Sequence, residues 1–373
     1  MLCSIPSANL VPREALPLPA PRKGRGTISN AVSRYEPAAR FAVDDGWGSG
    51  DEVAPPLATT FTLDSTRTII ARNDSPDIGF DRSINPYRGC EHGCVYCFAR
   101  PTHAYLGLSP GLDFESRIFV KPDAARLLAA ELAKPGYVCR TIAMGTNTDP
   151  YQPAERRYEI TRAILEILRA HRHPVSIVTN SALVQRDIDS LAEMAEQRLA
   201  TVMVSVTTLD RALARRMEPR AATPQRRLET VRALADAGIP TGVLAAPMIP
   251  ALNDAELEAI LTAAKEAGAM SAGYVVLRLP LELKGLFREW LEAHAPMKAR
   301  HVMSLVAELH GGKTYDARWG TRMSGSGKYA ELLRIRYELA CKRLGFRRGG
   351  NIGRLDTTLF RRPAAKGDQL TLL

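Results

Sequence analysis

The chain has 373 residues, six cysteines, and a formal net charge of +10 from 50 Lys and Arg against 40 Asp and Glu. This length allows one large domain or two ordinary ones, so a mini-protein held together by disulfides is excluded. Hydrophobic residues at 45% and charged residues at 24% are typical of globular proteins, which excludes global disorder and a fibrous repeat. The chain has no uncharged apolar run of about 18 residues and no signal-peptide core, so we expect a cytoplasmic protein without a membrane partner.

The first 57 residues are expected to form a poorly ordered extension or an arm that wraps around the rest. Residues 1–80 contain eight basic and nine acidic residues and are rich in Pro, Gly and Ser. Within them, only residues 58–63 have the pattern of a strand. We therefore expect the core domain, together with a short lead-in, to occupy residues 58–317.

The core domain alternates short apolar runs, predicted to be strands, with segments whose apolar residues recur at three and four, as in helices. After the first unit the strands start 26 to 40 residues apart, a spacing typical of β-α units in a parallel sheet. The sequence thus predicts an α/β fold, either a partial (β/α)6 TIM-like barrel or a doubly wound sheet. The predicted strands are 83–87, 141–145, 175–180, 201–206, 241–246 and 273–277, and the predicted helices include 124–133, 157–170, 188–197, 224–237 and 254–267.

Polar residues gather where the predicted strands end. In both candidate folds, the loops at the carboxyl ends of the strands form the functional site. A loop with three cysteines follows the first strand, and further candidate residues end or follow the next four. These residues are Thr146, Asn147, Asp149, Asn180, Ser205 and Pro247. Such clustering at one rim is typical of an enzyme.

The three cysteines of this loop, Cys90, Cys94 and Cys97, lie within eight residues. Clustered thiols in a reducing compartment usually bind metal or do chemistry. With Gly89 and Gly93 permitting a tight backbone, three thiolates can hold three irons of a cubane cluster. Since no fourth cysteine lies nearby, the fourth iron would stay open to another ligand, as in a catalytic centre.

The alternative is a structural zinc site in which His92 or His103 is the fourth ligand. The chain would then be a zinc-stabilised nucleic-acid-binding protein with structural cysteines. Zinc modules are usually small and self-contained, whereas this loop follows a strand within a β-α repeat. The iron-sulfur interpretation is therefore favoured.

The cysteine loop, with an aromatic residue directly before the last cysteine, resembles that of the radical S-adenosylmethionine (SAM) superfamily, whose fold is a six-unit partial barrel. Further motifs over about residues 80–345 are similar to the spore photoproduct lyase-like branch and its uncharacterised bacterial relatives. These motifs are Asp149-Pro150-Tyr151, Thr179 with Arg186-Asp187, Glu218-Pro219 followed by Arg227, Ala237-Gly238, Ala246-Pro247, Arg318-Trp319-Gly320 and Gly325-Ser326-Gly327-Lys328-Tyr329.

The resemblance implies a 4Fe-4S cluster on Cys90, Cys94 and Cys97, with S-adenosyl-L-methionine bound to the open iron. One electron from a reductant such as flavodoxin or ferredoxin would cleave SAM to methionine and a 5'-deoxyadenosyl radical, which abstracts hydrogen from a substrate. The chain would thus be a radical SAM enzyme.

Roles for the rim residues follow from their chemistry. Asp149, helped by Thr146 and Asn147, is suited to the amino group or sulfonium of SAM, although it is equally suited to capping a helix that starts near residue 153. Asn180 and Ser205 offer hydrogen bonds for the ribose or the carboxylate. The segment at Pro247 can present backbone groups to adenine, or it is simply a turn.

The sequence departs from the lyase at two places. Gly145 stands approximately where the lyase has a hydrogen-donor cysteine, and Asn180 stands where it has a lysine. Tyr96 is our candidate for passing a hydrogen atom, with packing against the cofactor as the alternative. Spore photoproduct itself is therefore not inferred as the substrate.

The charge imbalance is concentrated near the C-terminus, where residues 318–362 hold twelve Arg and Lys against three acidic residues. We expect residues 318–373 to be a helical, basic extension. Interleaved with Trp319, Tyr329 and Phe346, these cations are suited to a phosphate backbone, or they form an ordinary solvated helix face. The substrate class that we expect is DNA or RNA, in a repair-like or modification reaction.

Overall fold

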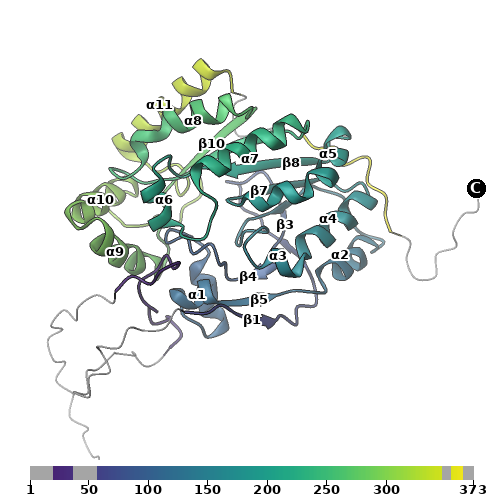
Figure 1. Ribbon diagram of the computed structural model, residues 1–373, viewed down its shortest axis with the longest axis horizontal. Coiled ribbons are helices and arrows are strands. Elements are labelled where there is room, and N and C mark those ends of the chain that lie inside the picture. Colours follow the sequence, from purple (N-terminus) through teal and green to yellow (C-terminus); the bar gives the residue numbers. More distant parts are fainter. Residues whose placement is uncertain (1–19, 37–56, 347–353, 364–373) are drawn as a thin grey trace, which may run out of the picture.

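The computed structural model describes residues 20–36, 57–346 and 354–363. Its centre is an open seven-stranded sheet (Figure 1), in which six parallel strands lie in the order β3-β6-β7-β8-β9-β10 and β2 adds antiparallel to one edge. Because neighbours in the chain are neighbours in space, the order has no switch point, so the fold is a partial barrel and not a doubly wound sheet. The strands are β2 Ile70–Arg72, β3 Arg82–Ile84, β6 Ile142–Met144, β7 Val175–Thr179, β8 Ala200–Ser205, β9 Thr241–Met248 and β10 Ser271–Val276.

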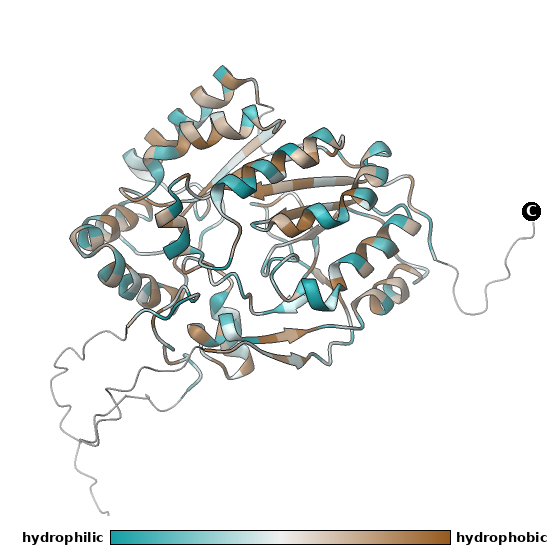
Figure 2. Ribbon diagram, in the orientation of Figure 1, coloured by the Kyte–Doolittle hydropathy of each residue, from teal (hydrophilic) through white to brown (hydrophobic). Residues whose placement is uncertain are grey.

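Helices pack along one face of this sheet and bury their apolar stripes against it (Figure 2). In α4, Ile160, Ile164 and Leu168 recur at the helical period, and all are buried. The helices after the strands are α2 Ala124–Leu132, α3 Glu155–Tyr158, α4 Ile160–Ala170, α5 Ile188–Glu196, α6 Arg211–Met217, α7 Pro224–Asp236, α8 Leu257–Glu266, α9 Leu283–His294, α10 Pro296–Leu309 and α11 Gly327–Leu344.

A second, three-stranded sheet in the order β1-β5-β4 lies beside the cysteine loop. The strand expected at 58–63 is found as β1 Thr60–Leu63, whereas β5 Arg117–Val120 was not expected because it is short and pairs with a segment far away in the chain. The second half of the run at 83–87 leaves the main sheet as β4 Tyr87–Arg88. Between β4 and β5 come the cysteine loop, the 3-10 helix η1 Arg100–Leu106 and α1 Leu112–Ser116.

Strand β9 is longer than expected, because it continues through Pro247 to Met248. Pro247 therefore lies in the strand and not in a turn after it. The register of β9 with β10 shifts between Tyr274 and Val276, because Pro247 has no amide hydrogen to donate. The alternative of a simple turn at Pro247 was wrong, since the strand continues through it.

The N-terminal segment 20–36 packs against the core. Ile28 is buried, the hydroxyl of Ser29 donates to Glu289, and Arg34 forms an ion pair with Glu282. This segment thereby connects the cysteine loop with α9. The rest of the expected extension, residues 1–19 and 37–56, lies outside the described residues.

The C-terminal segment runs to the opposite end of the barrel. Helix α11 packs on α8 and α10, and the described residues 354–363 then lie at the amino ends of the parallel strands. There, Asp356 N donates to Arg198 O and Arg361 N donates to His171 O, just before β8 and β7. Beside the same end, a cavity of about 360 Å³ is lined by residues 73–75, 78–81, 140 and 141.

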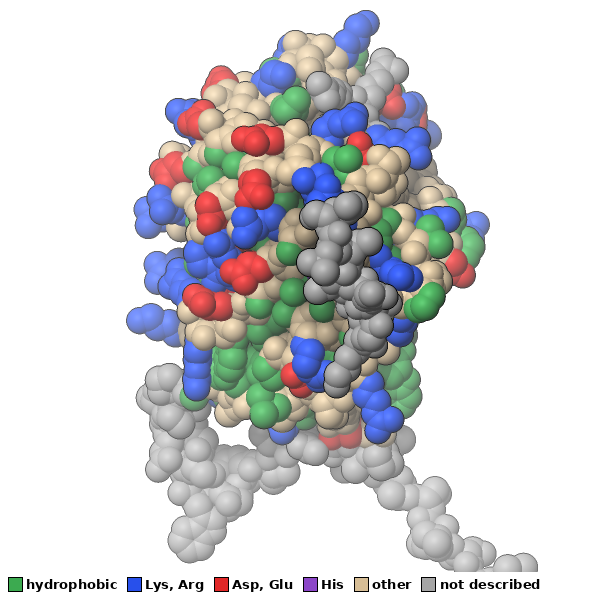
Figure 3. Space-filling view, turned by 90° about the vertical axis from the view of Figure 1, so that its right-hand side faces the viewer, with side chains coloured by type: hydrophobic (Ala, Val, Ile, Leu, Met, Phe, Trp, Pro, Cys, Tyr) green, Lys and Arg blue, Asp and Glu red, His purple; other side chains and the backbone are tan. Residues whose placement is uncertain are grey.

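Many C-terminal cations are already paired within the chain. Arg334 contacts Glu331 and Glu338, and Arg336 contacts Glu258, while Arg318 and Arg322 pair with aspartates. On the face shown in Figure 3, Lys and Arg are likewise interspersed with Asp and Glu. No described helix is long and apolar enough to cross a membrane.

Candidate active site

The cysteine loop folds tightly because glycines occupy its two sharpest positions. Gly89 and Gly93 have φ values of 77° and 69°, a region that favours glycine. A Cβ at Gly89 would lie 2.9 Å from Phe114 O, and one at Gly93 would lie 2.7 Å from a carboxylate oxygen of Glu115. Both positions thus exclude a side chain for reasons of conformation and of space.

Three neighbouring segments hold the backbone of the loop. Cys90 N donates to Phe114 O in α1 at 2.9 Å, and Val95 N donates to Met217 O in α6 at 2.9 Å. The Gln152 side chain joins the loop to the segment after β6, since it accepts from Glu91 N at 2.9 Å and donates to Gly89 O at 3.2 Å. The backbone of the loop is therefore held by α1, by α6 and by the segment after β6.

The three thiols on this loop are free and lie within each other's electrostatic influence. Cys90 and Cys94 are buried and Cys97 is half-buried. Burial raises the pKa of Cys94 well above its usual range, and Glu218, Cys90 and Cys97 raise it further. Burial likewise raises the pKa of Cys97 to about 11, against an opposing effect of Arg100. A bound cation favours the thiolate form of such buried thiols, so the set of Cys90, Cys94 and Cys97 on one loop fits a metal cluster.

The two histidines considered as zinc ligands have other partners. His92 Nδ1 lies 3.4 Å from Asp149 Oδ2, and His103 Nε2 lies 3.1 Å from Arg117 O. Among the described residues, no three His, Cys, Asp or Glu side chains converge as ligands of a single metal ion. A cubane cluster needs no such convergence, because each of its ligands holds a different iron.

Asp149 connects the ends of β6 and β7 to the cysteine loop. Its carboxylate accepts hydrogen bonds from Thr179 Oγ1 at 2.7 Å, from Asn180 N at 2.7 Å and from Tyr151 N at 2.8 Å. Burial favours the neutral acid, but His92 and these donors outweigh it and lower the pKa of Asp149. Burial also opposes the charge on His92, and Asp149 outweighs that effect and raises the pKa of His92 to about 10. A buried ion pair results.

Two expectations for Asp149 can be compared with this geometry. It does not cap the following helix, because the residue at the start of α3 is Ala154 and no side chain caps it. Its oxygens are instead taken up by the chain itself. Asp149 holds the backbone nitrogen of Asn180, and the side-chain Nδ2 of Asn180 lies 3.6 Å from Cys94 Sγ.

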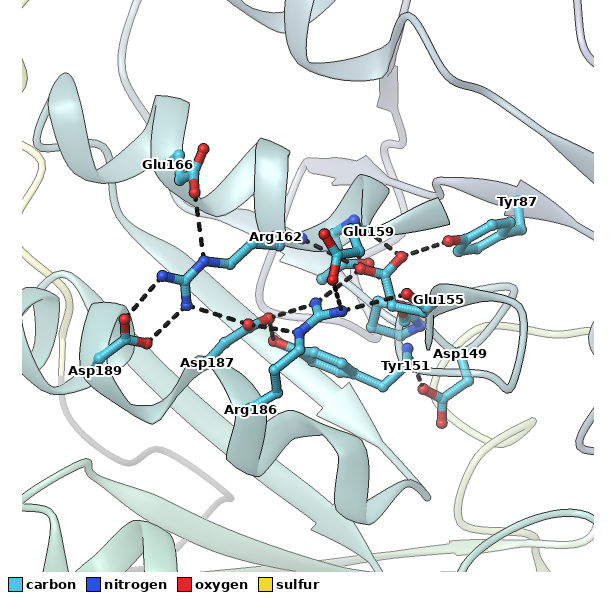
Figure 4. A network of polar contacts seen from close by, with 12 residues as sticks. Tyr87, Asp149, Tyr151, Glu155, Glu159, Arg162, Glu166, Arg186, Asp187 and Asp189 are labelled. Carbon is cyan, nitrogen blue, oxygen red and sulfur yellow. Dashed lines mark hydrogen bonds and ion pairs between the residues drawn. The ribbon is translucent and has the colours of Figure 1, made fainter. Parts of the chain in front are cut away.

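An extended ionic network lies beside the Asp149 loop (Figure 4). Buried Glu155 accepts from Tyr87 Oη and from Arg186, and Tyr151 Oη donates to Asp187 at 3.0 Å. Arg186 also binds Asp187. This network ties β4 and α3 to the 3-10 helix η2 Ala182–Asp187, so the loop between β6 and α3 has little freedom.

On the other side of the loop, Tyr96 belongs to a buried polar chain. Its hydroxyl donates to Glu218 at 3.0 Å and lies 3.2 Å from Thr207 Oγ1. Glu218 pairs with Arg227 at 2.6 Å, and Arg227 also donates to Ser205 O at 3.1 Å. Burial, followed by the charges of Cys94 and Glu218, raises the pKa of Tyr96 well above its usual range. The phenol therefore stays protonated.

The remaining candidates occupy the same rim. Ser205 Oγ donates to Ala246 O at 3.2 Å, and Pro247 O accepts from Asn253 Nδ2 at 2.9 Å. Thr146 Oγ1 and Asn147 N contact the side chain of Asn85 at 3.2 and 3.0 Å. The structure thus brings all the predicted residues to one end of the barrel, where Tyr96 belongs to the cysteine loop itself and Asp149 and Asn180 contact its residues His92 and Cys94.

Sequence reasoning missed two contributors. Asn85 organises the loop after β6, and the buried pair of Arg100 and Glu115, 2.6 Å apart, lies beside the cysteine loop. A polar residue at a strand end was a usable signal for Asn85. Nothing in the sequence connects Arg100 to Glu115, because Arg100 begins η1 and Glu115 lies in α1, two short helices that the sequence pattern did not predict.

An arginine and an aromatic side chain face each other across the mouth of the barrel. Phe98, directly after Cys97, is 42% exposed, and the guanidinium carbon of Arg278 lies 4.7 Å from its ring centre. Arg278 follows β10, the far end of the open sheet from β3. Its Nε is buried without a hydrogen-bond partner, and no described Asp or Glu forms an ion pair with it.

Comparisons with known proteins agree with this geometry. Residues 84–264 match the radical SAM superfamily. Uncharacterised proteins of Mycobacterium tuberculosis and Mycobacterium bovis are 41% identical over 225 residues, which is 60% of this chain and 66% of theirs. An uncharacterised protein of Acidianus two-tailed virus is 31% identical over 172 residues, 45% of this chain and 56% of its own.

Solved structures show the same fold at low sequence identity. Spore photoproduct lyase complexed with dinucleoside spore photoproduct superposes with a TM-score of 0.53 and 15% identity over 76% of this chain and 78% of that one. A variant of that lyase with bound AdoMet and the same dinucleoside gives a TM-score of 0.51 at 14% identity, over 76% of this chain and 78% of its own.

Proposed function

We propose that this chain, whose residues 84–264 match the radical SAM superfamily, binds a 4Fe-4S cluster through Cys90, Cys94 and Cys97 and uses it to cleave S-adenosyl-L-methionine reductively. The observation that carries the proposal is the set of three free thiols on one rigid loop at the carboxyl end of a partial barrel. When bound, the cluster and SAM would supply a 5'-deoxyadenosyl radical that abstracts hydrogen from a substrate.

The residues of the chain position these groups and exclude water. Asn180 donates toward Cys94 Sγ and stands at the rim where the polar groups of SAM would bind, together with Thr146 and Asn147. Asp149 acts on SAM through its partners, because three hydrogen bonds and His92 already occupy its oxygens. Ser205 would offer a hydrogen bond to the ribose of SAM, and the backbone at Pro247 would contact its adenine.

Tyr96 is the proposed catalytic side chain. Its raised pKa keeps the hydrogen on the phenol oxygen, and the hydroxyl points into a polar chain beside Cys94. A neutral phenol in this place can give up and recover a hydrogen atom. Changing Tyr96 to Phe should keep the fold and abolish turnover on the substrate while SAM cleavage continues.

The substrate class that we propose is nucleic acid, DNA or RNA. Exposed Phe98 offers a surface on which a base can stack, and Arg278 beside it lacks a carboxylate partner among the described residues. This pair lies next to Cys97, whereas the described residues 354–363 lie at the other end of the barrel. The twelve Arg and Lys of residues 318–362 would add a long-range electrostatic attraction to phosphate that does not depend on the base sequence. The proposed electron donor is a flavodoxin or ferredoxin.

The cluster is tested by anaerobic purification followed by iron, sulfide and EPR analysis. We expect iron and sulfide in equal amounts in the wild type, loss of both in Cys94→Ser, and retention in Cys341→Ser, where a buried cysteine far from the loop is changed. Stoichiometric zinc without a chromophore after iron-sulfide reconstitution would favour the alternative of a zinc-stabilised nucleic-acid-binding protein.

The substrate is tested by measuring 5'-deoxyadenosine with and without oligonucleotides at low salt. We expect oligonucleotides to stimulate its formation in the wild type and in Arg126→Gln, a change at an exposed arginine on α2, but not in Arg278→Gln. Equal rates with and without DNA or RNA in the wild type would contradict this proposal and leave the cluster assignment intact.

A further inference from the structure

Arg100 is a fully buried cation three residues after the last cysteine of the loop, with 0% of its surface exposed. Its Nε donates to Cys94 O at 2.8 Å, and Nη1 donates to Pro110 O and Gly111 O at 3.2 and 3.0 Å. Its Nη2 donates to Glu115 Oε1 at 2.6 Å. The guanidinium therefore holds the backbone of one of the three cysteines directly.

The N-terminal segment holds the carboxylate that pairs with this cation. Glu115, also 0% exposed, accepts from Gly26 N at 2.8 Å, from Thr27 N at 2.9 Å and from Thr27 Oγ1 at 2.8 Å. Arg25 donates to Glu115 O at 2.6 Å. Segment 20–36 thereby holds the pair of Arg100 and Glu115 in place beside the loop.

The charge of Arg100 acts on the sulfurs of the loop. Its guanidinium contacts Cys94 O at 2.8 Å, so a buried positive charge lies beside the segment that carries Cys94 and Cys97. A positive charge favours any negative charge added nearby, and in a buried site this attraction is weakly screened. Charge near an iron-sulfur cluster is one of the factors that set its reduction potential.

We propose that Arg100 is a positioning residue that fixes the cysteine loop and raises the reduction potential of the cluster bound there, with Glu115 and segment 20–36 holding it in place. This inference rests on the proposed function, since it concerns a cluster on Cys90, Cys94 and Cys97. It assigns a role to an ion pair that stability alone explains poorly, because desolvation cancels much of the attraction in a buried pair.

The experiment is an EPR-monitored redox titration of the holoprotein in four variants. Arg100→Gln removes the charge, Arg100→Lys keeps it, and Arg100→Gln with Glu115→Gln removes both charges so that no unpaired carboxylate remains buried. Arg82→Gln is the control, because Arg82 is also buried but lies at the start of β3, at the amino end of the strands.

We expect Arg100→Gln to lower the equilibrium constant for one-electron reduction by about tenfold, which corresponds to about 59 mV. The double variant should shift in the same direction by less, and Arg100→Lys and Arg82→Gln should stay near the wild type. An unshifted potential in both Arg100→Gln and the double variant, with full iron content, would overturn the inference. Absence of a cluster from the wild type would instead overturn the proposed function.

Discussion

The two ends of the parallel sheet are built differently. At the carboxyl ends, buried charges surround the cysteine loop in pairs, such as Arg227 with Glu218 and Arg100 with Glu115. At the amino ends, neutral His173 packs between Tyr137 and Phe360, and the buried cation Arg82 lies over the Tyr137 ring and pairs with an exposed aspartate, Asp81. Pairs in which both charges are buried therefore lie where irregular loops are held in one conformation, whereas the buried charge at the base packs against an aromatic ring.

The largest effect is expected from Glu218→Ala at the carboxyl end. Arg227 is 1% exposed, so the change leaves a buried guanidinium without its carboxylate, and Tyr96 loses a partner as well. We expect the free energy of unfolding to fall by about 3–5 kcal/mol, measured by urea denaturation of the apoprotein. The double variant Arg227→Met with Glu218→Leu should lose much less, and an equal loss in both would contradict the charge-pair explanation.

The next effect concerns pH at the amino end. Burial lowers the pKa of His173 to about 4, so the folded protein keeps this imidazole neutral while the unfolded chain takes up a proton near the usual value of 6.5. The associated stability is present above pH 6.5 and is lost as the pH falls toward 4, by about 3 kcal/mol.

This pH dependence can be isolated by His173→Gln, which does not titrate. Its free energy of unfolding should change less than that of the wild type between pH 6.5 and 4, in denaturant titrations at fixed pH. His103, whose pKa burial also lowers to about 4, continues to contribute in both proteins. Parallel curves for the variant and the wild type would show that His173 is not the titrating group.

Gly26→Ala is expected to lower stability by less, and also to disturb the cysteine loop directly. A Cβ at Gly26 would lie 1.7 Å from Gly93 O, so the N-terminal segment or the cysteine loop has to shift. We expect a loss of about 1–3 kcal/mol, together with lower iron content after reconstitution. Gly79→Ala is the control, because a Cβ there meets nothing within 4 Å. Equal iron content in both variants would show that segment 20–36 has no influence on cluster binding.

The smallest effect is expected from Asp123→Ala. Asp123 and Arg126 form an ion pair on α2 whose side chains are 65% and 70% exposed. Solvent screens such a pair, so its removal should change the free energy of unfolding by less than about 1 kcal/mol. A loss of unfolding free energy as large as that of Glu218→Ala would show that buried and exposed ion pairs do not differ here.

The features predicted from sequence are those with local patterns. The six strands, the helices between them and the cysteine loop each depend on residues close together in the chain. The choice between a partial barrel and a doubly wound sheet depends on the spatial order of the strands, which periodicity does not give. The contacts of Asn85 with Thr146 and of Thr27 with Glu115 join residues 61 and 88 positions apart. Only the folded backbone brings such residues together, so no spacing in the sequence reveals them.

Asp149 illustrates a second limit. An aspartate after a strand and before a proline is compatible with binding a ligand and with capping a helix. The structure excludes the cap, because Ala154 precedes α3, and it shows that Thr179, Asn180 and Tyr151 donate to the carboxylate. The pairing with His92 depends on how the cysteine loop closes over β6, which the sequence does not encode locally.

An open sheet has two edges, and exposed edges invite pairing with strands of other molecules. Here a side chain covers one edge, since Glu131 of α2 accepts hydrogen bonds from Ile69 N and Ile70 N at β2. At β10, Val276 N donates to Met323 O and Tyr337 Oη donates to Ala272 O, so backbone groups there are occupied as well. The barrel can thus stay open for a substrate without presenting a template for aggregation.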